Sequence, residues 1–334
     1  VYGLSLLTLI TAGIIYEMIA RNRRRLHFLV LMIAVIWING ALLSHTEFSH
    51  ANGKKLKVAM IQGNVPQEYK WQPEKTDTII DTYNQLTQAH WNADLILWPE
   101  AAIPMLKDEA APFLQHLEQQ AKKQQKTVLI GIPFKEDNLY YNGLILLGQS
   151  QGQYAKRHLI PFGEYTPFTT WLDPLMLALS IPMSSFSSGA ANQPPLVVNN
   201  IHFAPFICYE IVEPDEVRRS LQNAEMIITI SDDSWFDGSI ASEQHLQMAR
   251  MRSLENAMPQ LFLSSRGASA IIAADGKILA TLGEHQRGVL THTVSTVVGI
   301  TPWRRFGSQP TLLYCFLGLI ASIIYSNFSH RKIE

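Results

Sequence analysis

Three long apolar segments at the two ends of this 334-residue chain constrain its fold more than any other feature. The segment at 2–20 carries one charged residue, Glu17, and the segment at 26–44 has no Asp, Glu, Lys or Arg. Each is long enough to cross the ~30 Å hydrocarbon core of a bilayer as a helix. A third uncharged run, at 311–328, is at the short end of that range. We therefore predict three transmembrane helices, the alternative being buried helices of a soluble core.

Basic residues beside these segments predict their orientation. Four arginines lie within 21–25, between the first two segments, and His330, Arg331 and Lys332 follow the third. Clusters of this kind remain on the cytoplasmic side of a membrane. The intervening part of the chain, 46–309, is then expected on the outer side, which is the periplasm in a bacterium. Because the chain opens on Val1 inside an apolar segment, we also expect transmembrane helices that precede it.

The central part of the chain has the pattern of an α/β domain of about 250 residues, because short Val- and Ile-rich runs alternate with segments of helical spacing. Its predicted limits are 46–309, between a membrane region at 1–45 and a final helix with a short tail at 310–334. The segment 166–186 is apolar but interrupted by prolines, so it is either a core helix or an arm at the bilayer surface. The predicted strands are 56–62, 94–100, 127–133, 144–148, 201–208, 225–231, 260–265 and 269–274, and the predicted helices are 74–91, 110–126, 214–222 and 242–256.

Charge and cysteine content exclude several classes of function. The 27 Lys and Arg residues balance 28 Asp and Glu residues, so no basic field for nucleic acid is expected. Two cysteines, Cys208 and Cys315, cannot form a disulfide framework or a Cys-rich zinc site. His245 has no His or Cys partner at ligand spacing, and the acidic run at 232–237 fits a capped turn better than a cation loop. We expect no metal and no cofactor.

Residues suited to acyl transfer lie at the predicted ends of buried strands. Cys208 ends one such strand, Glu100 ends another, and Lys156 precedes a Pro-Phe-Gly turn that is followed by Glu164. Taken singly, each has an ordinary explanation: a core thiol, a turn cap, a solvated surface charge. Together they supply a nucleophile, a carboxylate base and a cation, the set that acyl transfer through a thioester requires.

Three motifs resemble those of a known family: "WPEAAIP" at 98–104, "AKRHLIPFGEYTPF" at 155–168 and "FICYEIVEPD" at 206–215. In this order they are similar to the Glu-Lys-Cys signature of the nitrilase, or carbon-nitrogen hydrolase, superfamily. With the stretch 231–259, they resemble its membrane branch, the apolipoprotein N-acyltransferases. The resemblance implies an α-β-β-α sandwich flanked by transmembrane helices. It also implies a multi-pass protein of the bacterial inner membrane with its catalytic domain in the periplasm.

The resemblance implies a role for each matching residue. Glu100 would be the general base, Lys156 would stabilise the oxyanion, and Cys208 would take an acyl chain from a phospholipid, with phosphatidylethanolamine the expected donor. The thioester would then pass to the α-amine of a diacylglyceryl apolipoprotein, with ping-pong kinetics. Glu164 would support the site. Tyr209 and Glu210 would help to shape the oxyanion site.

Four apolar side chains are candidate lipid contacts. Trp235 and Phe236 lie in "DDSWFDGS", and Trp171 and Leu175 lie in the interrupted apolar segment. The alternative for Trp235 and Phe236 is simple loop packing. Arg266 departs from the Asn-rich turn of the family branch, which leaves substrate contacts at that turn open. Two other functions also remain open: a membrane-tethered amidase acting on a small substrate, and a lipid-binding scaffold without catalysis.

Overall fold

The computed structural model describes residues 2–20, 26–167 and 185–330, the last six without their side chains. The chain forms two compact units, one made of residues 49–299 and one made of residues 1–48 with 300–334. The arginine-rich loop at 21–25 lies outside the described residues.

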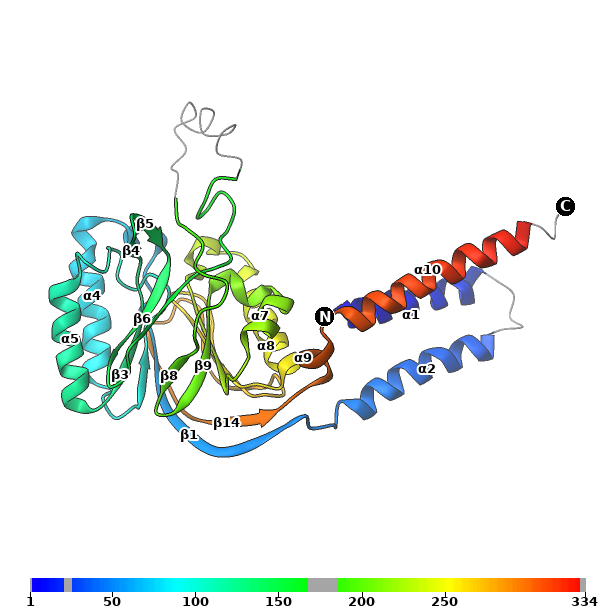
Figure 1. Cartoon of the computed structure of the whole chain (residues 1–334), viewed down its shortest axis with the longest axis horizontal. Coiled ribbons are helices and arrows are strands. Elements are labelled where there is room, and N and C mark those ends of the chain that lie inside the picture. Colours follow the sequence, from blue (N-terminus) through cyan, green and yellow to red (C-terminus); the bar gives the residue numbers. More distant parts are fainter. Residues whose placement is uncertain (1, 21–25, 168–184, 331–334) are drawn as a thin grey trace, which may run out of the picture. The chain divides into compact units, whose positions relative to one another are not determined.

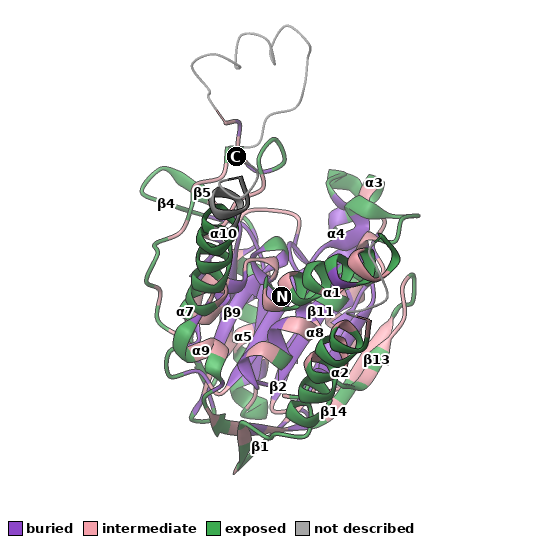
Figure 2. Cartoon of the chain, turned by 90° about the vertical axis from the view of Figure 1, so that its right-hand side faces the viewer, coloured by how far each residue is buried: buried purple, intermediate pink, exposed green. Residues whose placement is uncertain are grey.

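The terminal unit is helical. Two of its helices are long and apolar enough to cross a membrane, and Gln309–Ile324 forms a shorter apolar stretch of a third. Along α1 and α2 a single residue, Ile14, is buried, and all three long helices appear largely green in Figure 2. A helix that exposes apolar side chains all round suits a lipid environment better than water. The bounds of these helices are α1 Tyr2–Ala20, α2 Leu26–Leu43, α9 Pro302–Phe306 and α10 Gln309–His330.

The larger unit contains two six-stranded sheets (Figure 1). The first has the order β14-β1-β2-β3-β6-β7. Its central strands β1, β2 and β3 are parallel to one another. The pairs β14 with β1, β6 with β3, and β7 with β6 are antiparallel. The strands β1, β2, β3 and β7 therefore all end at the same edge. The strand bounds are β1 Ser49–Gln62, β2 Leu95–Leu97, β3 Thr127–Gly131, β6 Gly143–Gly148, β7 Gly152–Ala155 and β14 Gly288–Gly299.

The second sheet has the order β13-β12-β11-β10-β9-β8. Here β9, β10 and β11 are parallel, so they too end at one edge. A small separate hairpin is formed by β4 (Phe134–Glu136) and β5 (Leu139–Tyr141). The strand bounds of the second sheet are β8 Leu196–Val198, β9 Ile201–Ile207, β10 Met226–Ser231, β11 Gln260–Ser264, β12 Ser269–Ile272 and β13 Ile278–Leu282.

Four layers result, because each sheet is buried on both faces. Along β1, Val58 and Met60 pack between the sheets, whereas Ala59 and Ile61 pack beneath helices on the outer face. This alternation is what the two-residue period of a strand dictates. Helices α4 and α5 cover the first sheet, and α7 and α8 cover the second (Figure 1). The bounds of the helices are α3 Gln67–Lys70, α4 Pro73–Gln88, α5 Ala111–Gln124, α7 Pro214–Ser220 and α8 Ala241–Asn256, with 3₁₀ turns η2 Cys208–Val212 and η3 Asp233–Phe236.

The predicted α-β-β-α sandwich is thus confirmed.

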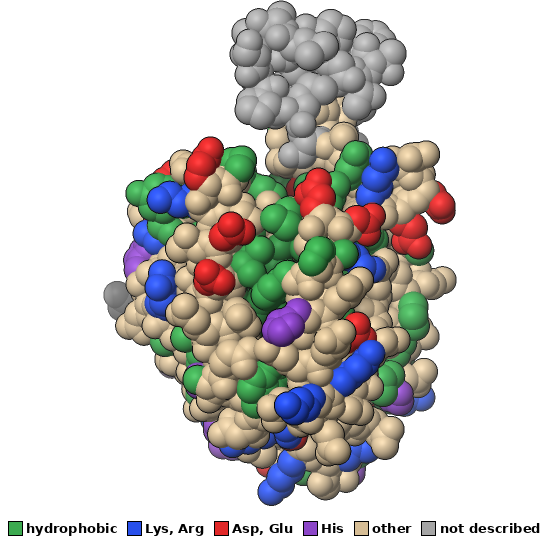
Figure 3. Space-filling view, turned by 90° about the vertical axis from the view of Figure 1, so that its left-hand side faces the viewer, with side chains coloured by type: hydrophobic (Ala, Val, Ile, Leu, Met, Phe, Trp, Pro, Cys, Tyr) green, Lys and Arg blue, Asp and Glu red, His purple; other side chains and the backbone are tan. Residues whose placement is uncertain are grey.

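On the face shown in Figure 3, acidic and basic side chains are interspersed, without a field of one sign. The predicted strand at 94–100 is shorter than expected, since it covers Leu95–Leu97 and leaves Glu100 in the turn beyond it. Within the part of the chain that the structure describes, six strands were not predicted: β4, β5, β7, β8, β13 and β14.

Candidate active site

The sequence-predicted site residues gather where the parallel strands of both sheets end. Glu100 follows β2, Lys156 follows β7, and Cys208 follows β9. Functional groups of α/β sheets lie at this edge because the turns after the strands leave side chains free to converge. The fold therefore brings together three segments that are far apart in sequence.

Lys156 lies at the centre of a buried ion network. Its Nζ atom lies 2.9 Å from each carboxylate oxygen of Glu164 and 3.5 Å from Oε1 of Glu100. Asn142 donates from Nδ2 to both carboxylates, at 2.7 Å each. The Lys156 side chain is 1% exposed, so this lysine is not the solvated surface charge that its type usually is.

The surroundings of Lys156 maintain its charge. Burial by itself lowers the pKa of this amine, but the negative charges of Glu100 and Glu164, together with the hydrogen bond to Glu164, outweigh burial and raise it. Lys156 is therefore a fixed ammonium group rather than a base. Such a group can stabilise an oxyanion that forms beside it.

Two further hydrogen bonds hold Glu100, one at its side chain and one at its backbone. Its Oε2 atom accepts from the Asp232 N–H at 2.9 Å, and its backbone carbonyl accepts from Lys70 Nζ at 2.9 Å. Lys70 is buried and forms an ion pair with Asp232. The neighbouring strand also leaves room for this turn, because a Cβ atom on Gly131 would lie 2.7 Å from the Glu100 Cα atom. Glycine at 131 thus permits the close approach on which the position of Glu100 depends.

Cys208 occupies a strained position at the first residue of η2. Its φ angle is +53°, in the left-handed region that costs a non-glycine residue about 1–2 kcal/mol. Burial raises the pKa of its thiol, Glu100 raises it further, and Lys156 opposes both. The resting group is therefore the neutral thiol, and it needs a base in order to act as a nucleophile.

Glu210 fixes the turn that carries Cys208. Its buried carboxylate accepts from the Ile207 and Arg157 N–H groups at 2.7 Å each and from the His158 N–H at 3.2 Å. The Tyr154 hydroxyl also donates to it, at 2.9 Å. Glu210 thus joins the residue before Cys208 to the residue after Lys156. Its carboxylate is occupied by these bonds, whereas the adjacent Tyr209 is exposed and its ring lies 6.0 Å from that of His158.

His245 and Asp233 form a second buried charge pair beside the thiol. Nδ1 of His245 lies 2.8 Å from Asp233 Oδ1, and Nε2 lies 3.2 Å from the Cys208 carbonyl oxygen. Both partners are acceptors, so both ring nitrogens must carry protons, which makes this histidine a cation. Burial lowers the pKa of His245, but the charge and hydrogen bond of Asp233 outweigh burial and raise it.

A cavity of about 380 Å³, which we call the catalytic cavity, opens onto Glu100 and Glu164, whereas Lys156 and Cys208 are not part of its lining. Glu100, Glu164, Asn142 and Asp232 supply its polar wall, whereas Trp71, Pro133, Phe186 and Trp235 supply an apolar wall. Trp235 lines the cavity although it is largely exposed to solvent, and Phe236 beside it is half exposed. Trp171 and Leu175 lie outside the described residues.

Sequence reasoning missed several residues of this site. Asn142, Lys70 and His245 each contact one of the predicted catalytic residues. Asn142 and Lys70 lie outside the family motifs, whereas His245 and its partner Asp233 lie in the matching stretch 231–259 but received no role. Asp232 does cap the following turn through Ser234, as predicted, but it also binds Lys70 and Glu100. The available signal was the polarity of "SDDS" directly after a buried strand. Within the described ranges no group of three or more His, Cys, Asp or Glu side chains has the geometry of a metal site.

Comparisons with known proteins place these features in context. The Carbon-nitrogen hydrolase family profile matches residues 57–305. The chain is 37% identical to the apolipoprotein N-acyltransferase of Coxiella burnetii over 97% of its own length and 67% of that protein. It is 35% identical to the protein of that name from Photobacterium profundum, over 97% and 64% of the two chains. The chain thus spans about two thirds of the length of these relatives.

A solved structure supports the same architecture. The carbon-nitrogen hydrolase from Helicobacter pylori superposes with a TM-score of 0.54 at 18% identity. The match covers 72% of this chain and 88% of that protein. At this identity, the likeness is evidence for the fold alone.

Proposed function

This chain belongs to the carbon-nitrogen hydrolase family and, within it, to the apolipoprotein N-acyltransferases, and from this premise we propose that Cys208 carries an acyl group from a phospholipid to a lipoprotein amine. The observation that carries the proposal is the position of Lys156. A buried ammonium group is shared by two carboxylates at the edge where a neutral thiol directly follows β9. A nucleophile, a base and an oxyanion partner are thereby present together.

In the first half-reaction, Glu100 takes the proton of the Cys208 thiol. Glu100 has an acceptor position left for this proton. A carboxylate has about four acceptor positions, and Asn142, Lys156 and the Asp232 N–H occupy three of those on Glu100. The thiolate attacks the ester carbonyl carbon of a phospholipid, and Lys156 stabilises the tetrahedral oxyanion. Collapse breaks the ester C–O bond, and the departing lysophospholipid oxygen takes the proton from Glu100. The product on the enzyme is an acyl-thioester.

In the second half-reaction, the α-amine of a diacylglyceryl-modified N-terminal cysteine attacks the thioester carbonyl. Glu100 takes a proton from the attacking nitrogen, and Lys156 again stabilises the oxyanion. Collapse breaks the C–S bond and forms the amide. The proton on Glu100 then returns to the Cys208 thiolate, which restores the resting enzyme.

Glu164, Glu210 and His245 act as positioning residues in this scheme. Glu164 holds the Lys156 ammonium group with two contacts of 2.9 Å. Glu210 holds the residue before the strained Cys208 through the Ile207 N–H, and His245 holds Cys208 itself through its carbonyl. A strained conformation persists only where surrounding contacts fix it.

The apolar lining of a second cavity, beside the catalytic cavity, supports a lipid donor over a small amide as the substrate. Trp71, Pro133 and Phe186 of the catalytic cavity also line a second cavity of about 320 Å³, together with Met105, Leu106 and Tyr140. Burial of an acyl chain contributes about 0.8 kcal/mol per CH₂ group, so an apolar extension of this kind favours a long-chain substrate. The apolar helices α1 and α2 would hold the enzyme in the bacterial inner membrane where that substrate lies, with residues 46–309 on the periplasmic side.

A two-substrate assay tests this function. Full-length protein in lipid nanodiscs is supplied with acyl-labelled phosphatidylethanolamine and a diacylglyceryl lipopeptide, and transfer of label to the peptide amine is measured. We expect transfer with parallel double-reciprocal lines, loss of transfer with Cys208→Ala, and normal transfer with Cys315→Ala. Release of ammonia from small amides without use of phospholipid would instead indicate an amidase, and tolerance of Cys208→Ala would indicate a scaffold.

A further inference from the structure

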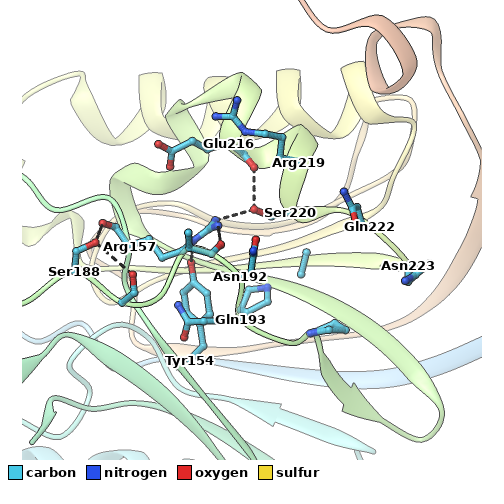
Figure 4. Close-up of a pocket in the computed structure, with 15 residues that line it drawn as sticks. Tyr154, Arg157, Ser188, Asn192, Gln193, Glu216, Arg219, Ser220, Gln222 and Asn223 are labelled. Carbon is cyan, nitrogen blue, oxygen red and sulfur yellow. Dashed lines mark hydrogen bonds between the residues drawn. The ribbon is translucent and has the colours of Figure 1, made fainter. Parts of the chain in front are cut away.

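A cavity of about 860 Å³, more than twice the volume of the catalytic cavity, is lined by Tyr154 and Arg157, which flank the Lys156 segment (Figure 4). Its walls come from β7, from the loop before β8, from the middle of β9, and from α7 with the turn that follows it. We call it the amide-lined cavity, after the side chains Asn192, Gln193, Gln222 and Asn223 on its walls.

The chemistry of this cavity suits an uncharged polar chain. Asn192, Gln222 and Asn223 are exposed, and no side-chain hydrogen bond to another described residue occupies them. Each amide offers both a donor and an acceptor, as a peptide group does. Gln193 shows the pairing directly, because its Oε1 atom accepts from the Ala155 N–H at 2.8 Å and its Nε2 atom donates to the Ala155 carbonyl at 2.7 Å.

The charges in the cavity do not suit a phosphate. Arg157 already donates to the Tyr154 hydroxyl, to the Ala191 carbonyl and to the Ser220 hydroxyl, at 3.1, 3.0 and 2.7 Å. Glu216 shares the lining with Arg219, so an acidic group accompanies the second arginine. Because Arg157 is engaged, a phospholipid head group would meet the single exposed guanidinium of Arg219, with the acidic Glu216 in the same lining, rather than a concentrated positive charge.

The amide-lined cavity is related to the catalytic cavity through shared lining residues. Arg157 and Ser188 also line an intermediate cavity of about 430 Å³, and Phe186 lines both that cavity and the catalytic one. Arg157 directly follows Lys156, and its N–H donates to Glu210. A chain whose first residue reacts at Cys208 can therefore lead away along these walls.

We propose that the amide-lined cavity binds the polypeptide segment that follows the N-terminal cysteine of the acceptor, through the main chain of that segment. This inference rests on the proposed function, in which the acceptor reacts through its α-amine and its remaining chain must leave the catalytic cavity. Acceptors of different sequence have only their backbone in common. Amide side chains bind that backbone without selecting for side chains.

The test separates the two half-reactions. Asn192→Ala, Gln222→Ala and Asn223→Ala are combined in the full-length protein, with a control that replaces Gln115, Gln119 and Gln124, three exposed amides of α5, by Ala. Thioester formation from phosphatidylethanolamine should be unchanged in both. Because each lost hydrogen bond contributes modestly, kcat/KM for a ten-residue acceptor lipopeptide should fall ~10–100-fold in the first variant alone.

Acceptor length gives the second readout. Wild-type protein should prefer the ten-residue lipopeptide to a lipopeptide of two residues, and the cavity variant should lose this preference. Equal use of both lengths by wild-type protein would overturn the inference. So would an unchanged preference in the variant, or slower thioester formation, which would assign the cavity to the donor.

Binding is also measured without catalysis, so that failure of the proposed function can be recognised separately. The Cys208→Ala chain in nanodiscs should bind the fluorescent ten-residue lipopeptide more tightly than the same chain with the three cavity substitutions. Equal affinity would overturn the inference. If wild-type protein forms no thioester while this difference persists, the proposed function fails and the binding site stands.

Discussion

The two sheets contribute unlike halves to one site. The first sheet supplies Glu100, Lys156 and Glu164, which are fixed by opposite charges in direct contact. The second sheet supplies Cys208, whose backbone is strained and is held by Glu210 and His245 through main-chain hydrogen bonds. The first half of the site therefore depends on charge balance, and the second half depends on backbone geometry. Substitutions in the two halves should therefore fail in different ways.

Lys156→Met should have the largest effect, because it removes the cation between two buried carboxylates. We expect acyl transfer to fall by about 10³-fold. We also expect the free energy of unfolding to fall by about 3–5 kcal/mol, since breaking a buried ion pair leaves an uncompensated charge. Denaturant unfolding of the protein in detergent and the two-substrate assay measure the two quantities.

Lys122→Met is the matched control for this substitution. Lys122 pairs with Glu118 at 2.8 Å on the exposed surface of α5, where a helical ion pair contributes about 0.3–0.5 kcal/mol. Equal effects of the two substitutions would contradict the role of charge balance in the first half of the site.

Glu210→Gln should lower activity by displacing the nucleophile rather than by removing charge. Glutamine would place its NH₂ group against one of the backbone N–H groups that now donate a hydrogen bond to Glu210. A shift of about 1 Å at Cys208 is enough to lower kcat ~10²-fold. Glu225→Gln, before β10 and therefore at the opposite ends of the strands, should leave kcat unchanged. A crystal structure of the Glu210→Gln variant with Cys208 undisplaced and low activity would contradict this explanation.

His245→Gln should change how stability depends on pH. The pKa of His245 is raised in the folded state, so its contribution is complete below its unfolded pKa of ~6.5 and is lost as pH rises through the folded value. Asp233 has a lowered pKa, so its contribution is lost only as pH falls through that lowered value. We expect the variant to lose about 2 kcal/mol at pH 6 and less at high pH.

The measurement is the free energy of unfolding at several pH values, with His285→Gln as control. His285 is half exposed and lies 3.2 Å from Asp237, so its replacement should change stability little at any pH. A loss for His245→Gln that grows with pH would contradict the assignment of His245 as a cation.

The smallest effect should appear in the alkylation of Cys208. Because its thiol pKa is raised, modification by uncharged iodoacetamide should still accelerate above pH 9 in a Cys315→Ala background. Lys156→Met should move this rise to higher pH, because Lys156 opposes the increase in pKa. A plateau near pH 8 in either protein would show that the second half of the site does not raise the thiol pKa.

The sequence predicts the three central residues of this site better than the residues that hold them in place. Glu100, Lys156 and Cys208 follow apolar runs, and parallel strands bring such positions to one edge. Asn142 and Lys70 could not be predicted. They contact Glu100 but lie 42 and 30 residues from it in the sequence, respectively, and neither follows a buried core strand. The His245–Asp233 pair needs the fold as well, since a helix and a turn must meet beneath Cys208.

The missed strands have a common physical reason. β14 has polar residues at 291–293 and buries only Val294 and Thr296, so it lacks the continuous apolar run of a central strand. It is nonetheless paired along the length of β1, from Ser49–Gly299 to Gln62–Gly288. Pairing at an edge of a sheet requires backbone groups more than apolar side chains, and that leaves little pattern in the sequence.

Mass spectrometry of the protein after incubation with phosphatidylethanolamine alone tests the central claim most directly. We predict one acyl group per chain, on the peptide that contains Cys208, removable by hydroxylamine and transferred to a lipopeptide amine when acceptor is added. No adduct on Cys208, or an adduct that does not pass to the amine while product still forms, would contradict the proposal that this thiol carries the acyl group.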